Sequence, residues 1–148
     1  MAIRGLQVLG LACLLAGAGL TGFEPAAAQP EPPGPAARNY NPQTVETVEG
    51  TVMSVERTAP SRHGGAGVHL TLRTAQGPLA VHLGPTWFID GQPLRVAAGD
   101  RITVTGSRID MAGKPALIAR SLTKGGETLT LRDEAGRPVW AGQRPRTP

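Results

Sequence analysis

The chain has 148 residues, a formal net charge of +4 at pH 7 and a single cysteine, Cys13. This length is sufficient for one domain, and the position of Cys13 inside an apolar leader excludes a disulfide scaffold or a thiolate metal site in the remainder. The positive charge comes from arginines scattered among acids, so charge alone does not indicate a nucleic-acid-binding protein.

Residues 1–28 have the three parts of a secretory signal peptide. A short basic start, Met1–Arg4, precedes an almost wholly apolar run over residues 5–22, and Ala26–Ala28 offers small residues for cleavage. A membrane anchor is the alternative, but the run is rich in glycine and near the lower length limit for a span. We therefore expect cleavage after Ala28, a periplasmic or secreted protein, and no transmembrane segment after cleavage.

A proline-rich linker is expected over residues 29–44, because prolines crowd its first part with alanine and glycine between them. The folded domain is expected over residues 45–142, followed by a polar tail over 143–148. The domain begins with a strand-rich stretch, Val45–Glu56, whose alternation of apolar residues changes phase around Gly50. Such a pattern predicts a strand that is bent or bulged and serves two parts of a sheet.

A β-hairpin is predicted over Gly67–Pro85, after a polar loop. Apolar and polar residues alternate on both sides of a turn at Thr74–Gly77, which is typical of strands with one buried face. Pairing Arg73 with Pro78 places the leucines of both strands on the buried face. The same register places His69 opposite His82 on the other face.

The remaining elements are a short crossover and further strands. Thr86–Asp90 predicts one helical turn that plugs the core, and Arg101–Arg108 predicts a strand with Ile102 and Val104 inward and Thr103, Thr105 and Ser107 outward. A turn at Asp110–Gly113 leads into a strand over Lys114–Thr123. A small hairpin over Thr128–Trp140 follows.

This order predicts an all-β fold, namely a small five-stranded OB-type barrel with a short crossover turn and an appended C-terminal hairpin. Closure into a barrel removes exposed strand edges, which suits a domain without disulfides. Another small β-barrel or sandwich is the alternative.

Several stretches resemble a known group of proteins. They are Val48–Val52, Val81–Trp87, Gly99–Ser107, Lys114–Arg120, Leu129–Asp133 and Gly136–Trp140. Together they resemble small exported bacterial OB-fold proteins and are similar to the MamS/MamX-type domain of magnetosome-associated proteins, over roughly residues 45–142. The resemblance implies the fold and an envelope location, and it implies no catalytic residue.

The histidine pair is the sharpest candidate site. Directly opposed residues on antiparallel strands have Cβ atoms about 4.5–5.5 Å apart, and two imidazoles at that spacing can share one divalent Cu, Zn or Ni ion. His63, in the loop before the hairpin, is a candidate third ligand for a site at His69 and His82. The alternative is a pair of half-exposed rings that only pack against each other or against Trp87.

A second candidate is a ligand-binding surface formed by Trp87, Arg73 and Trp140, because OB barrels use aromatic platforms to bind single strands or sugars. The alternative is that both tryptophans pack in the core. With few aromatics and no basic run, nucleic-acid binding is the weaker use of such a surface.

No nucleophile–base pair, phosphate-binding loop or pair of catalytic carboxylates is visible in the sequence, and the aspartates Asp90, Asp100, Asp110 and Asp133 fall beside glycines or in turns. We therefore expect an exported, non-enzymatic OB-fold binding module of the bacterial envelope, with a protein or small ligand as its partner. A divalent-metal-binding protein using His69 and His82 and a nucleic-acid-binding OB domain are the alternatives.

Overall fold

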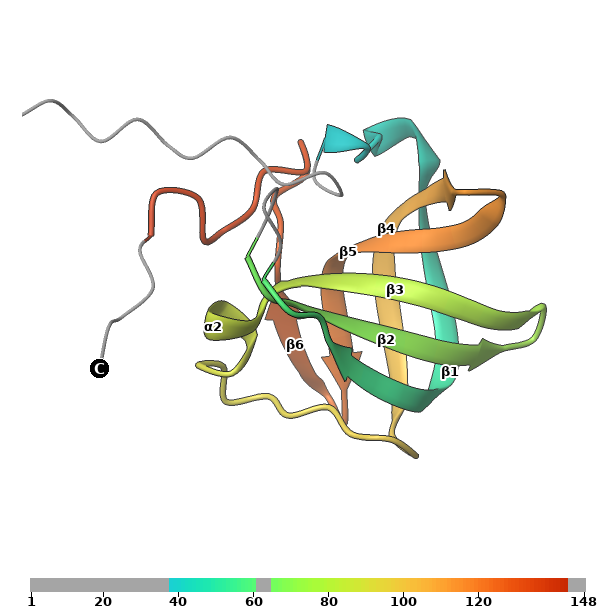
Figure 1. The fold of residues 1–148 in the computed structure, drawn as a ribbon. Helices are drawn as coiled ribbons and strands as arrows, with labels where there is room; N and C mark the ends of the chain where they lie inside the picture. The colour runs from blue at the N-terminus through green and yellow to red at the C-terminus, as the bar shows by residue number, and fades with distance from the viewer. Residues whose placement is uncertain (1–37, 61–64, 144–148) are drawn as a thin grey trace, which may run out of the picture.

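The computed structural model describes residues 38–60 and 65–143. It is nearly all β, with a short 3-10 helix and one four-residue helical turn between strands (Figure 1). In chain order the elements are η1 (Pro42–Thr44), β1 (Val45–Arg57), β2 (Gly67–Thr74), β3 (Gly77–Pro85), α2 (Thr86–Ile89), β4 (Arg101–Met111), β5 (Lys114–Lys124) and β6 (Glu127–Thr130). The predicted signal peptide, most of the linker and nearly all of the tail lie outside the described residues.

Five strands close into a ring. The sheet order is β3-β2-β1-β4-β5-β6, and a parallel pairing of β3 with β5 joins the ends of the five-stranded part. Strand β6 pairs with β5 outside this ring, and an isolated bridge between Arg132 and Pro138 follows it. The prediction of an all-β, five-stranded OB-type barrel with an appended C-terminal hairpin is therefore confirmed.

Strand β1 serves two sides of the barrel, as its shifted pattern predicted. Residues 45–51 pair with β4, and residues 51–57 pair with β2. A Cβ at Gly50 would lie 2.6 Å from the carbonyl oxygen of Arg73, so this position requires glycine. The irregular pairing itself falls between Val52 and Ser54, three residues beyond the centre expected from the sequence.

The hairpin of β2 and β3 has the predicted register, with Arg73 opposite Pro78 and His69 opposite His82. Its inward-facing residues join those of β1, β4, β5 and the C-terminal segment in one core. The buried members of this core include Leu70, Leu72, Val81, Leu83, Ile102, Val104, Leu117, Leu122 and Leu131. Each hairpin residue that faces away from this core therefore lies on the outer surface of the barrel.

Ser107 faces outward, as predicted, but its side chain is fully buried, because Asn41 and Thr44 from the chain before β1 cover it. The pairing of β4 with β5 shifts between Thr105 and Gly106, where Arg120 is the extra residue of β5, so β4 itself keeps its alternation. A Cβ at Gly106 would collide with the main-chain carbonyl of Ile118, so the close approach depends on glycine. The hydroxyl of Ser107 accepts a hydrogen bond from the main-chain N–H of Asn41 at 2.9 Å.

One end of the barrel is closed by α2 and the segment that follows it. Phe88, Ile89 and Val96 pack against the core from this end, and Leu94 belongs to it. The predicted helical turn that plugs the core is confirmed by this packing. Among residues 38–60 and 65–143, none of the helices is long and apolar enough to cross a membrane.

Candidate metal centre

A row of residues runs across the outer face of the barrel on five neighbouring strands. Each member pairs with the next across the sheet. Leu70 and Val81, the sequence neighbours of the two histidines in this row, point into the core. We call this set the outer row. From its exposed end to its buried end it consists of Glu56, His69, His82, Ile118 and Ser107.

The buried end of the outer row is covered by chain that flanks the barrel. Besides the bond from Asn41, the hydroxyl of Thr44 lies 2.9 Å from that of Ser107. Tyr40, in the stretch assigned to the linker by its sequence, lies against Gly136 in the C-terminal segment. Structure that packs on the barrel therefore begins before Val45, and the two histidines lie at the boundary between covered and open surface.

A buried arginine crosses the β3–β5 seam beside the histidines. Nη1 of Arg132 donates hydrogen bonds to the main-chain carbonyls of Leu83, at 3.1 Å, and Ala119. These two residues follow directly after His82 and Ile118, the last pair of the parallel β3–β5 register. The guanidinium therefore links β3 to β5 one residue beyond the point where their main-chain pairing ends. Burial lowers the pKa of Arg132 to about 10, which leaves it charged at neutral pH.

Trp140 covers this guanidinium. Its ring centroid lies 5.0 Å from the Cζ atom of Arg132, in the geometry of a cation–π contact. The same ring rests on Gly84 of β3, where a Cβ would meet it at 2.6 Å. The packing of Trp140 fits the alternative that the sequence left open. Arg132 was missed, and its signal in the sequence was its place in the Leu129–Asp133 stretch used for the resemblance.

The two histidines contact each other directly. Nδ1 of His82 lies 3.2 Å from Nε2 of His69, and the ring centroids are 4.2 Å apart at an interplanar angle of 66°. Both side chains are half-buried. The structure thus brings the predicted pair together, whereas His63 lies outside the described residues.

Burial favours the neutral form of both imidazoles. It lowers the pKa of His69, against a smaller opposite effect of Glu56. It lowers the pKa of His82 to about 4, with the charges of His69 and Arg132 acting in the same direction. Neutral imidazole is the form that binds metal ions, so at pH 7 neither ring must lose a proton to become a ligand.

The spacing of the ring nitrogens fits a shared metal ion. Two nitrogens that each lie about 2.0–2.1 Å from a tetrahedral ion are about 3.3 Å apart, close to the 3.2 Å between His69 and His82. A hydrogen bond between the rings fits the same distance. Within the described parts of the chain, no three His, Cys, Asp or Glu side chains converge on one point as they stand.

The predicted ligand-binding residues do not form one surface. Phe88 lies between the two tryptophans, with ring centroids 6.0 Å from Trp87 and 5.1 Å from Trp140, so the tryptophans join one aromatic cluster through it. Arg73 lies at the other end of β2, beside the hairpin turn. A ligand contact at each of the three residues stays a prediction.

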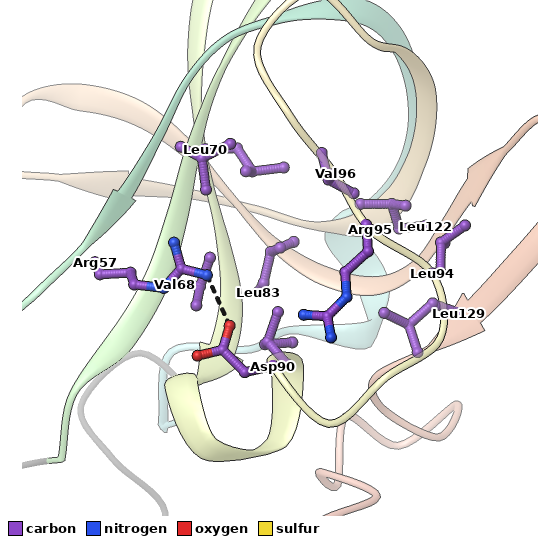
Figure 2. A pocket seen from close by; sticks show the side chains of 12 residues that line it. Arg57, Val68, Leu70, Leu83, Asp90, Leu94, Arg95, Val96, Leu122 and Leu129 are labelled. Carbon is purple, nitrogen blue, oxygen red and sulfur yellow. Dashed lines mark hydrogen bonds and ion pairs between the residues drawn. The ribbon is translucent and has the colours of Figure 1, made fainter.

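A small cavity lies inside the barrel beneath α2, lined largely by leucines and valines (Figure 2). An ion pair of 2.7 Å between Arg57 and Asp90 stands at its edge. Its volume of about 40 Å³ has room for water but is far below the roughly 300–1,000 Å³ of small-molecule pockets. The outer row is therefore a better candidate site than this cavity.

Fold and site together define a small OB-type barrel protein with a histidine pair on its outer face. The model of the MamS/MamX magnetosome protein family matches residues 44–129, more than half of the chain, and the protein belongs to this family. The matched range extends from η1 into β6 and ends before Arg132 and Trp140. A search of curated proteins gave no significant match.

Proposed function

We propose that this protein is an exported, non-enzymatic binding module, associated with the magnetosome, whose ligand is a divalent transition-metal ion held by His69 and His82. The observation that carries the proposal is the 3.2 Å separation of the two ring nitrogens, which suits a shared ion. Membership of the MamS/MamX family supports the magnetosome association.

The chemistry of the pair favours borderline metal ions. Imidazole suits zinc, copper and nickel, whereas magnesium and calcium prefer oxygen ligands. The rings are neutral at pH 7 because of their burial, and the open end of the outer row gives an ion access from the Glu56 side. A protein that carries a metal ion, or that docks to a partner through one, needs only these metal ligands and no catalytic residue.

The N-terminal sequence supports export. A basic start, an apolar run and an Ala-Ala-Ala site stand in the order that signal peptidases recognise. Expression of the full chain in a bacterium with two membranes, followed by mass measurement of the periplasmic product, tests this part. A product that begins at Gln29 is expected, and a full-length product retained in the cytoplasm would contradict export.

Isothermal titration calorimetry of the purified protein with Zn²⁺, Cu²⁺ and Ni²⁺ tests the metal site. We expect one ion per chain with a dissociation constant in the micromolar range or tighter, and loss of binding in a His69→Ala, His82→Ala double variant. Thr71→Ala is the matched control, because Thr71 lies on the same outer face of β2. Absence of micromolar binding, or equal binding by the double variant, would refute the proposal.

A further inference from the structure

Glu56 is the neighbour of His69 on the open side of the outer row. It lies on β1 directly opposite His69, and its side chain is exposed. Directly opposed residues of antiparallel strands have Cβ atoms about 4.5–5.5 Å apart, which is within reach of a glutamate side chain. This pairing was not predictable from the sequence, because it depends on the register of β1 with β2 after the irregularity at Val52–Ser54.

The carboxylate of Glu56 is also unengaged, unlike the other glutamates of β1. Glu46 pairs with Arg108 at 2.6 Å, and Glu49 pairs with Arg101 at 2.7 Å. Among the residues that the structure describes, Glu56 takes part in no hydrogen bond or ion pair. Its charge acts on His69, where it partly offsets the lowering of the ring's pKa by burial.

We propose that Glu56 is the third ligand of the metal ion, so that the outer row holds it through two imidazoles and one carboxylate. This inference rests on the proposed function and deepens it. In the structure the three side chains do not converge on one point. Because the Glu56 side chain is exposed, a change of its rotamer brings the carboxylate to the histidine pair without movement of the sheet.

Such a ligand set has two chemical consequences. The carboxylate cancels one of the two positive charges of the ion, which stabilises it at a partly buried site. Three protein ligands on one sheet face also leave the fourth coordination position of the ion open to solvent. Catalytic and exchangeable metal sites have such an open position, whereas structural sites are closed. The buried end of the row, at Ile118 and Ser107, does not offer such an opening.

The decisive experiment compares Glu56→Gln with Glu49→Gln by calorimetric titration with Zn²⁺. Both substitutions remove one negative charge from β1, but Glu49 is engaged with Arg101 on the side of β1 that pairs with β4. We expect Glu56→Gln to weaken binding by about 10–100-fold with an unchanged stoichiometry, and Glu49→Gln to change it less than about 2-fold. A circular dichroism spectrum checks that each variant is folded.

The electron paramagnetic resonance spectrum of bound Cu²⁺ separates ligation from a field effect. Loss of an oxygen ligand alters the copper parameters, so Glu56→Gln should change the spectrum and Glu49→Gln should not. Equal affinity of Glu56→Gln and the unaltered protein, equal weakening by both variants, or loss of binding in His63→Ala instead would overturn the inference. If those results come with binding that still requires His69 and His82, the proposed function stands without Glu56. No binding by the unaltered protein would remove both.

Discussion

Arg132 donates a hydrogen bond to the main-chain carbonyl of Leu83, which lies 49 residues earlier in the chain. With a second bond to Ala119 it ties β3 to β5 just beyond their parallel pairing. A charged side chain from outside the five-stranded ring therefore adds to the main-chain pairing that closes this barrel. A buried guanidinium that donates to two main-chain carbonyls and lies against an aromatic ring is costly to remove, because the carbonyls stay buried.

Arg132→Met should reduce the free energy of unfolding by about 2–4 kcal/mol, since two buried carbonyl groups lose their donor. Urea denaturation followed by circular dichroism measures this change. Arg101→Met is the control, because its ion pair with Glu49 is exposed and should contribute less than about 1 kcal/mol. Equal losses in the two variants would show that Arg132 does not close the seam.

Gly84→Ala should displace Trp140. The added methyl group would overlap the indole ring, which then has to leave its position over Arg132. We expect a red shift of tryptophan fluorescence and a lower thermal midpoint. Gly65→Ala, which has open space around the added carbon, should leave both unchanged. An unshifted spectrum in Gly84→Ala would contradict the placement of Trp140.

Gly106→Ala should be among the most destabilising single-methyl changes in the chain, because the added carbon meets the main chain at Ile118 rather than a movable side chain. A loss of more than about 2 kcal/mol in urea denaturation is expected, in line with overpacking of a close contact. A loss of less than about 0.5 kcal/mol would mean that the bulge between Thr105 and Gly106 is not fixed by this approach.

The protonation of His82 should make stability depend on pH. Its pKa is lowered to about 4 in the folded state against 6.5 in an unperturbed side chain, so the unfolded chain binds the proton more readily. Stability from this group is complete above pH 6.5 and is lost as the pH falls toward 4. Denaturation midpoints between pH 7 and 4 measure this loss, and His82→Gln should show a smaller decrease. A metal-free His82 ring that titrates near 6.5 by NMR would contradict the prediction.

The pattern of alternating residues was sufficient to predict the hairpin register and hence the contact of His69 with His82. Turn position and buried leucines leave one register in which both strands hide their apolar face. The order of strands and the glycine in β1 were likewise enough to predict an OB-type barrel. These features depend on local sequence, where strand period and turn chemistry act directly.

Other features depended on contacts between distant residues. Ser107 faces outward as its alternation predicted, but its burial under Asn41 and Thr44 is not visible in that alternation. The position of Arg132 at the seam required knowledge of which strands close the barrel, and an arginine in a polar C-terminal stretch predicts an exposed charge. Glu56 was missed for the same reason, because its position opposite His69 exists only across the β1–β2 pair.

The measurement that tests the central claim most directly is a long-range ¹H–¹⁵N NMR spectrum of the histidine rings during titration with Zn²⁺. The account predicts that the resonances of His82 Nδ1 and His69 Nε2 shift together and that the shifts saturate at one ion per chain. The bound ion then replaces the direct contact between the two rings. Unshifted resonances of both rings at saturating zinc, or a shift confined to His63, would contradict it.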